Sequence, residues 1–482
     1  MAFSRGTVIR SFLWKFFEKI SSQLIQFIVT IVLARLLLPS EYGSIALITI
    51  FIALCSVIID GGFNTALVQK QNADNLDFST ILYFSIGLSV FLYGVMFICA
   101  PLIATFYNDV ELIPVIRVLS LTLPFFAINS IQRAYVSKKM LFKRLFYSSL
   151  GAIALSGAIG IYMAYHGYGV WALVAQSLSS QIITTLIMWY TLKWRPITEF
   201  SIERFKGLFD YGWKIFGANF ITTLFINARK LVIGKLFAPA SLACYEKGGH
   251  IPSMVVDNVF SSIQAILLPT LSETQDNKGQ VKSMMRRSTK LSCFVIYPLM
   301  MLMIVSAQPL VVLLLTEKWI GAVPFVQILS LSYFLRPITI SNWEAIKALG
   351  YSSITLKLEI YKKFIDISIL ICTAFVSVYA IAWGQVLFNV ICVFINLAPN
   401  KKLLNYGISE QLRDALPSFF ISLVGGACAY CALRFPLPNI WILVIQFFIL
   451  TVTYLGLSIL FKEESCMYIL QIVKDNKSKF KL

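Results

Sequence analysis

The sequence predicts an all-α membrane protein that crosses the bilayer about fourteen times. Hydrophobic residues make up 58% of its 482 residues and charged residues only 13%, whereas soluble domains carry roughly 25% charged residues. The mean hydropathy is +0.77. The apolar residues form continuous runs about as long as the roughly 20 residues of helix that span a hydrocarbon core. Because strands of a membrane barrel would alternate polar and apolar residues, the runs exclude a β-barrel.

Short polar loops separate the apolar runs, so each run marks one expected span. The fourteen expected spans are residues 12–37, 42–62, 80–104, 113–133, 145–165, 168–190, 208–236, 242–267, 290–315, 323–342, 358–378, 379–397, 414–433 and 439–461. No segment between them is long enough to form a soluble domain. We therefore expect the function to depend on side chains buried between membrane-spanning helices.

Lysine and arginine concentrate at both ends of the chain and in every second loop. The basic residues of this side are Arg5, Arg10, Lys138, Lys139, Lys143, Arg144, Lys193, Arg195, Arg204, Lys206, Lys278, Lys282, Arg286, Arg287, Lys290, Lys401, Lys402, Lys474, Lys477, Lys479 and Lys481. The loops of the other side carry chiefly Lys318 and Arg434. The positive-inside rule then predicts that both termini are cytoplasmic. Because the bias sets the orientation, the net charge of +18 does not require a nucleic-acid partner.

Two smaller features are expected to carry no chemistry. Cys428 and Cys431 form a C-x-x-C pair inside an apolar run, without the second pair that a zinc site needs, so we expect them to pack as small apolar residues. No other group of ligands suggests a metal or a cofactor. The short basic tail from Lys462 is expected to be solvated, with contact to anionic lipid as the alternative.

The two halves of the chain contain similar segments. Residues 12–45 resemble residues 211–245, and a Trp-Lys-Phe-Phe segment at Trp14 matches a Trp-Lys-Ile-Phe segment at Trp213. Further matches follow in the same order with an offset of about 200 residues, which indicates an internal repeat. Six spans separate corresponding elements, so the repeats are parallel, and two such lobes around a central cleft are typical of alternating access. The expected domains are an N-lobe of residues 1–200, a C-lobe of residues 201–405, and two extra spans with a basic cytoplasmic tail in residues 406–482.

Five short motifs lie along the chain between residues 5 and 405. They are Leu33–Pro39, Asp60–Gly62, Gly169–Val174, Trp194–Pro196 and Leu268–Ser272. In sequence and order they resemble the multidrug/oligosaccharidyl-lipid/polysaccharide (MOP) exporter superfamily, whose members have a MATE-like fold. Within it the chain is similar to the Wzx-type flippases of O-antigen and exopolysaccharide, in particular to the WzxC-like branch.

This resemblance implies a transporter rather than an enzyme. It implies a flippase that moves undecaprenyl-pyrophosphate-linked oligosaccharide from the cytoplasmic to the outer leaflet of the bacterial inner membrane, for lipopolysaccharide or exopolysaccharide synthesis. It also implies membrane lipids, a proton or sodium counter-ion, a polysaccharide polymerase and a chain-length regulator as partners. The chain departs from the family in span seven, where Arg229 stands at the position of a frequent acidic residue.

Three other functions stay open. A multidrug or cation exporter of the same superfamily would favour an acidic cleft, whereas the spans of this chain hold more lysine and arginine than acid. A membrane enzyme such as an O-antigen polymerase would need a carboxylate cluster or a large loop, and the sequence has neither. A lipid II flippase would share both the fold and a pyrophosphate substrate.

Basic and amide side chains within the spans are the candidates for binding that anionic substrate. Lys19, Gln23 and Gln26 recur at spacings of four and three residues, so they lie on one helix face and suit a polar cavity wall. The alternative is that Lys19 is an interfacial anchor. Arg229 is expected to bind phosphate, or else to pair with Asp257 or Asp366.

The next two spans supply further binding candidates. Lys247 and His250 open span eight, and Arg336 precedes Pro337 in span ten. Histidine is the side chain that can change charge near neutral pH, so His250 could take part in proton coupling, with a hydrogen-bonded interface histidine as the alternative. It could also pair with Glu246 four residues earlier. Arg336 is expected to face the cavity.

Three acids inside the spans are the candidates for ion coupling: Asp257, Asp60 and Asp366. Asp60 precedes two glycines, so its alternative role is to cap a helix end. Asp366 follows Lys362 and Lys363 by four and three residues, so an ion pair is its alternative. Asp257 is the preferred candidate.

Overall fold

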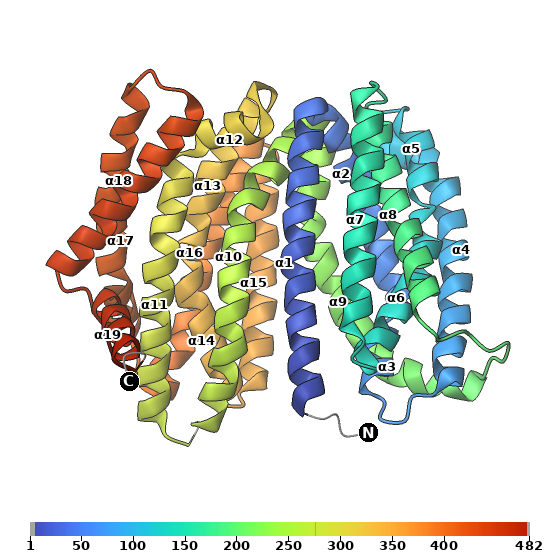
Figure 1. Ribbon diagram of the computed structural model, residues 1–482, viewed down its shortest axis with the longest axis horizontal. Helices are drawn as coiled ribbons and strands as arrows, with labels where there is room; N and C mark the ends of the chain where they lie inside the picture. The colour runs from blue at the N-terminus through green and yellow to red at the C-terminus, as the bar shows by residue number, and fades with distance from the viewer. Residues whose placement is uncertain (1–4, 275, 480–482) are drawn as a thin grey trace. The chain divides into compact units, whose positions relative to one another are not determined.

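The structure is a computed structural model that describes residues 5–274 and 276–479, and its regular elements are all helical (Figure 1). It divides into two compact units, Met1–Ala243 and Cys244–Leu482. One helix, α10, begins in the first unit and ends in the second. The predicted lobe boundaries at residues 200 and 405 concern the internal repeat, which packing within each unit does not test, so they stay predictions.

The first unit is built from nine helices and the start of α10. They are α1 (Arg5–Leu36), α2 (Pro39–Asp60), α3 (Phe63–Gln69), α4 (Asn75–Tyr107), α5 (Leu112–Leu119), α6 (Thr122–Lys138), α7 (Phe142–Tyr165), α8 (Val170–Thr191) and α9 (Ile202–Leu236). Local chemistry sets several helix ends: Asp74 accepts the Asp77 N–H at 3.0 Å to cap α4, and Ser201 caps α9. Helix α7 packs between α1 and α8, while α9 packs on α2, α3 and α4.

Glycines allow α9 to approach its neighbours closely. A Cβ atom on Gly62 would lie 2.3 Å from the carbonyl oxygen of Gly212, and one on Gly234 would overlap the side chain of Leu47. Gly62 also has a φ of 72°, in the left-handed region that glycine adopts without strain. The backbone of α9 is therefore fixed against the start of α3 at one end and against α2 near the other.

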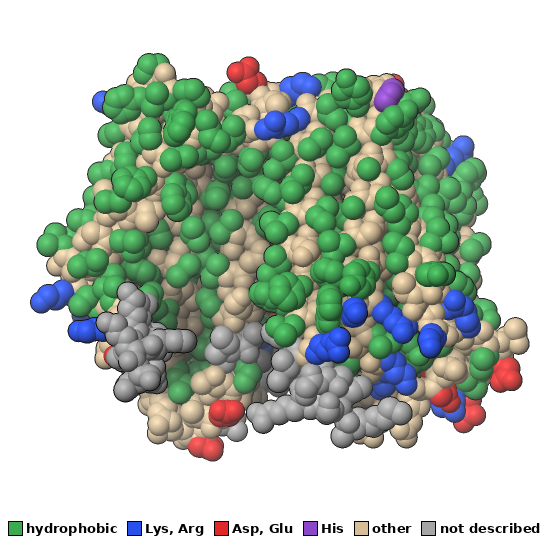
Figure 2. Space-filling view, viewed as in Figure 1, with side chains coloured by type: hydrophobic (Ala, Val, Ile, Leu, Met, Phe, Trp, Pro, Cys, Tyr) green, Lys and Arg blue, Asp and Glu red, His purple; other side chains and the backbone are tan. Residues whose placement is uncertain are grey.

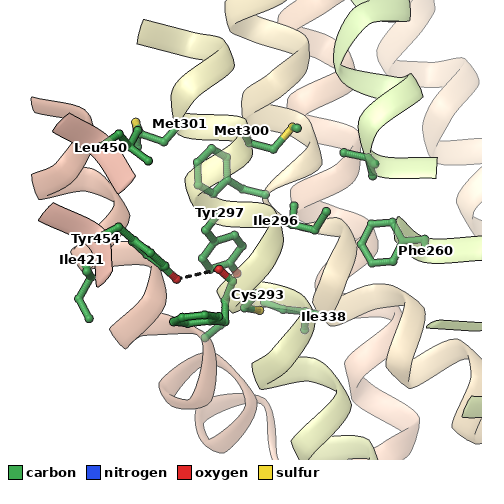
Figure 3. Packing of buried hydrophobic residues seen from close by; sticks show 14 of the residues in the cluster. Phe260, Cys293, Ile296, Tyr297, Met300, Met301, Ile338, Ile421, Leu450 and Tyr454 are labelled. Atoms are coloured by element: carbon green, nitrogen blue, oxygen red, sulfur yellow. Dashed lines mark hydrogen bonds between the residues drawn. The ribbon is translucent and has the colours of Figure 1, made fainter. Parts of the chain in front are cut away.

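The second unit continues with helices that surround a common core. They are α10 (Pro239–Glu273), α11 (Lys278–Val305), α12 (Ala307–Leu315), η1 (Glu317–Ala322), α13 (Val323–Tyr333), α14 (Arg336–Ala348), α15 (Ser352–Ala374), α16 (Val378–Leu404), α17 (Ile408–Tyr430), η2 (Cys431–Arg434), α18 (Asn439–Leu460) and α19 (Glu464–Lys479). Figure 3 shows Ile296, Tyr297 and Met300 of α11 in this core, which also includes Phe260 of α10 and Tyr454 of α18. The Tyr454 hydroxyl donates to the Phe294 carbonyl at 2.9 Å, which satisfies a polar group among apolar ones.

Eleven helices among the described residues are long and apolar enough to cross a membrane, and a twelfth span forms if η1, α13 and α14 count together. The polytopic all-α class is therefore confirmed. Two more long helices, α9 and α15, fall outside this group because charged side chains interrupt their apolar residues. The surface agrees with a membrane protein: hydrophobic side chains cover the sides of both units, and within the first unit lysine and arginine gather toward the end where α7 begins (Figure 2).

Two predictions about the second unit are wrong. Cys428 and Cys431 are exposed rather than packed, because they lie on the outward side where α17 passes into η2. The tail from Lys462 is not a solvated strand of chain but forms α19, which packs on α11 and α18. Two buried residues hold the start of α19 in place: the apolar Cys466, which is 4% exposed, and the charged Glu463, which is also buried.

Candidate substrate-binding face of the second unit

A break in one span of the second unit places an arginine at the start of a helix. Helices α13 and α14 are bent by 41° where they meet, and Arg336 is the first residue of α14. Pro337 occupies the first turn of α14, where its missing N–H costs nothing, and it disfavours a helical conformation for the residue before it. The sequence thus breaks the span at the position of its charged side chain.

Arg336 has both an acidic and an aromatic environment. Its Nη1 lies 2.6 Å from Oδ1 of Asp257 on α10, and the two side chains are 38% and 57% exposed. Its guanidinium lies 5.8 Å from the ring centre of Phe260 and 5.5 Å from that of Tyr333. An arginine held beside aromatic faces keeps the planar donors that bind phosphate in pairs.

A second group of polar side chains continues along α14. Glu344 is buried, and it accepts hydrogen bonds from Lys347 at 2.7 Å and from Gln264 of α10 at 3.1 Å. Arg336, Trp343 and Lys347 lie seven and eleven residues apart, which places them on one side of the helix over roughly 16 Å of its length. These side chains lie along one side of α14, with Ile340 between Arg336 and Trp343.

Besides α10 and α14, helix α15 also contributes residues to this surface. The Lys362 ammonium lies 4.3 Å from the Trp343 ring centre and 2.5 Å from the Glu359 carboxylate. We call this surface the α14 face; it consists of Asp257, Gln264, Arg336, Trp343, Glu344, Lys347, Glu359 and Lys362. Its three cations each contact an acid, so it is balanced in charge rather than purely cationic.

The back of α14 is fixed by a buried amide network. Asn342 donates to the Gln411 side chain at 2.7 Å, and Asn400 donates to the Asn342 side chain at 2.5 Å. Gln411 in turn donates to the Tyr406 carbonyl at 3.0 Å. Because such groups are costly to bury without partners, the network sets the rotation of α14 and with it the direction of its polar face.

The remaining candidates of the second unit lie on two helices. Lys247 is half-buried and His250 exposed on the first half of α10, and both have electrostatic partners. The proposed pairing of His250 with Glu246 stays a prediction. Asp366 lies half-buried on α15 and has an interacting neighbour, and Lys362 of the same helix lies 2.5 Å from Glu359.

The candidates of the first unit are spread over three helices. Lys19, Gln23 and Gln26 follow one another on α1, with Lys19 and Gln26 exposed and Gln23 half-buried. Arg229 lies on α9 and has interacting neighbours. Asp60 is the last residue of α2 and accepts a hydrogen bond from the Ser130 hydroxyl at 2.8 Å.

Sequence reasoning missed five residues of the α14 face, namely Gln264, Trp343, Glu344, Lys347 and Glu359, and it named Lys362 only as a possible partner of Asp366. A usable signal was the run Asn-Trp-Glu-Ala-Ile-Lys at residues 342–347, which places an acid and a base three apart directly after an apolar run. Among the described residues, no three His, Cys, Asp or Glu side chains come together as metal ligands.

Comparison with known proteins gives the family. A profile of the family described as polysaccharide biosynthesis protein matches residues 32–324. The succinoglycan biosynthesis transport protein ExoT of Rhizobium meliloti (strain 1021) is 23% identical over 329 residues, which are 68% of this chain and 66% of ExoT, just under two thirds. The lipopolysaccharide biosynthesis protein WzxC of Escherichia coli (strain K12) is 21% identical over 400 residues, which are 81% of this chain and 80% of WzxC.

Solved structures give the fold. The lipid II flippase MurJ in an inward closed conformation matches with a TM-score of 0.73 at 15% identity, over 94% of this chain and 99% of MurJ. At that identity the likeness concerns the fold alone, whereas the profile covers more than half of the sequence. The chain belongs to the polysaccharide biosynthesis protein family, the Wzx-like flippases of the MOP superfamily, and is a multi-pass bacterial membrane transporter rather than an enzyme.

Proposed function

We propose that this transporter moves undecaprenyl-pyrophosphate-linked oligosaccharide repeat units across the bacterial inner membrane by alternating access. The pyrophosphate binds to cations within the spans, the sugars occupy the aqueous space between the lobes, and the polyprenyl chain stays in lipid. Reorientation of the two lobes then presents the head group to the opposite side.

The single observation that carries this proposal is the position of Arg336. A charged side chain near the bilayer centre costs about 2.5–3.5 kcal/mol on insertion scales, so it is retained where it binds something. Arg336 lies at the bend of a span, is 38% exposed, and has aromatic rings on two sides. Its planar donors suit a phosphate, and the Trp343 ring farther along α14 suits the face of a sugar.

Because the cations of the α14 face are paired with acids, a phosphate would bind there in exchange for a carboxylate. Asp257 pairs with the Arg336 guanidinium at 2.6 Å, so a phosphate that binds Arg336 would compete with this carboxylate. The displaced acid is then free to take up a proton or a sodium ion, which supports Asp257 as the coupling residue. Asp60 and Asp366 stay candidates for the same role, and Lys19, Gln23, Gln26, Arg229, Lys247 and His250 stay candidates for contacts to the substrate.

We also propose that α9 and α15 cross the membrane, which gives fourteen spans. They contain 35 and 23 residues, enough for a hydrocarbon core of about 30 Å. Their charged residues then lie within the membrane, where they need a polar interior. With fourteen spans both termini share one side, and the basic loops favour the cytoplasm for that side.

The experiment reconstitutes the purified protein in liposomes with a fluorescent undecaprenyl-pyrophosphate oligosaccharide and follows its movement between leaflets. Arg336→Gln is compared with Arg434→Gln, an exposed arginine of η2 that serves as the matched control. Loss of a hydrogen bond to a charged group costs roughly 1.5–3 kcal/mol, so the Arg336 variant should move substrate about 10–100-fold more slowly. Arg229→Gln is measured beside it.

The outcomes separate the function from the site. Wild-type movement with an unaffected Arg336→Gln variant would discard the α14 face and keep the flippase. No movement above empty liposomes, with several donor saccharides and an imposed ion gradient, would overturn the flippase function itself. Faster movement of lipid II than of the oligosaccharide donors would reassign the substrate.

A further inference from the structure

The last helix of the chain begins where a membrane span ends. Helix α18 has 22 residues, close to the length that spans a hydrocarbon core, and it ends at Leu460. Only three residues separate it from α19, and Lys462 among them has a φ of 51°, which turns the chain sharply. Figure 1 shows α19 below α17 and α18 and close to end-on, whereas α17 and α18 run from top to bottom in the plane of the picture. A span formed by α18 would therefore place the start of α19 at the edge of the hydrocarbon core.

Polar contacts hold α19 in this position. The Glu463 carboxylate accepts the Cys466 N–H at 2.8 Å, which caps the first turn of α19, and it also accepts a bond from Ser418 of α17 at 3.5 Å. Glu464 lies 2.5 Å from Lys290 of α11, and the Arg287 guanidinium lies 4.3 Å from the ring centre of Tyr468. These contacts attach α19 to α17 and α11, so it has one fixed side.

The opposite side of α19 is both apolar and basic. Met467 and Leu470 are 43% and 45% exposed, and Lys474 is exposed one turn farther along the same stripe. The turn before the helix adds Phe461, which is 68% exposed, and the exposed Lys462. Apolar side chains next to lysines are the pattern of a helix that lies in the membrane interface.

We infer that this side of α19 lies in the headgroup layer of the membrane and binds anionic phospholipid. Two observations select lipid as the occupant. The neighbouring spans also expose apolar side chains: Phe420 of α17 is 55% exposed, and Leu455, Ile459 and Leu460 in the last turns of α18 are 43%, 51% and 71% exposed. The exposed lysines beside it, Lys462 and Lys474, match a lipid phosphate, and each basic residue near an anionic surface favours binding. Of the exposed acids of this helix, Glu464 is paired with Lys290 and Asp475 has an interacting neighbour.

The test places a fluorescent label on the full-length protein in lipid nanodiscs. Met467→Cys is labelled in a background in which the exposed Cys372, Cys428 and Cys431 are replaced by serine. Lipids that carry a quencher near the headgroup report contact. Leu455→Cys on α18 shows that the protein is inserted, and Lys278→Cys, exposed at the start of α11, is the control for a position in water.

We expect strong quenching at positions 467 and 455 and little at 278. Quenching at 467 should rise when phosphatidylglycerol replaces part of the phosphatidylcholine, and the Lys462→Gln, Lys474→Gln double variant should lose at least half of that rise. A label at 467 that resembles the one at 278, with 455 still quenched, would overturn the membrane contact. Quenching that is the same with and without phosphatidylglycerol would overturn the selection of anionic lipid.

Discussion

The close contact between α9 and the start of α3 predicts a large effect of one methyl group. Gly62→Ala places a Cβ atom 2.3 Å from the Gly212 carbonyl oxygen and also keeps a φ of 72° at a residue with a side chain. The left-handed conformation costs about 1–2 kcal/mol, and overpacking adds roughly 1–3 kcal/mol. We therefore expect Gly62→Ala to destabilise the first unit by about 2–5 kcal/mol.

Three other glycines separate the two causes. Gly212→Ala tests the steric part alone, because its Cβ would meet the Gly61 carbonyl oxygen at 2.8 Å while its own conformation is helical. Gly167→Ala tests the backbone part alone, since its φ is 79° and nothing lies within 4 Å. Gly87→Ala tests neither, because it lies inside α4 with open space around it.

The assay is thermal unfolding of the detergent-solubilised protein, followed by intrinsic fluorescence, with the same detergent and lipid content for every variant. The expected order of loss is Gly62→Ala, then Gly212→Ala and Gly167→Ala, with Gly87→Ala equal to or above wild type because alanine favours a helix. Gly62→Ala melting at the temperature of Gly87→Ala would refute the close contact of α9 with α3. Gly62→Ala matching Gly167→Ala would leave only the backbone cost.

Three more predictions concern charge and polar groups. The carboxylate of Asp414 is nearly buried and accepts two bonds from Arg286 at 2.8 Å and one from Tyr406 at 2.7 Å, and it lies 3.1 Å from the Lys290 ammonium. Asp414→Asn should lower the free energy of unfolding by up to about 3–5 kcal/mol, and by less than this limit because Arg286 is 43% exposed. An unchanged melting temperature would contradict this prediction. The hydrogen bond from the Asp77 N–H, together with the charge of Arg204, holds the pKa of Asp74 below its ordinary 3.8. The ionised carboxylate that caps α4 therefore stabilises the protein above pH 3.8, and this contribution is lost as the pH falls through the lowered pKa. The melting temperatures of wild type and Asp74→Asn should differ at pH 7 and converge in acid, and a difference that does not change with pH would exclude titration of Asp74 as the cause. Tyr454→Phe leaves the buried Phe294 carbonyl without its 2.9 Å donor and should cost about 1–3 kcal/mol, whereas Tyr430→Phe, at an exposed position, should melt as wild type does.

The sequence predicts the spans well because hydropathy and helix length are local properties. Each of the fourteen expected runs overlaps a helix of the described chain, and α13 with α14 shows that one run can contain a bend. The proline after Arg336 indicates that bend. The tail beyond Lys462 was predicted poorly, because α19 is fixed by Lys290 and Ser418, far away in the sequence.

Partners of charged residues were harder to predict than the residues themselves. Arg336 and Asp257 were both recognised as functional candidates, but spacing could not reveal that they contact each other across 79 residues. In the same way, Lys362 was considered only as a partner for Asp366, four residues away, while the structure places it on Trp343 of another helix. Local spacing finds pairs on one helix, and only the packing of helices finds the others.

Helices α9 and α15, which hydropathy alone does not identify as spans, carry the charged side chains that a transporter of a charged substrate needs. An apolar span can rest in lipid, whereas α9 and α15 carry several charges each and are stable in a membrane only beside other polar groups. In α15 Lys362 pairs with Glu359 of the same helix, and its ammonium also lies 4.3 Å from the ring centre of Trp343 on α14. Because every cation of the α14 face already has an acid, a phosphate bound as we propose would replace an existing partner, and charge would stay paired in lipid in both states. We therefore expect specificity to depend on Asp257 as much as on Arg336: Asp257→Asn should bind the pyrophosphate more tightly and release it more slowly.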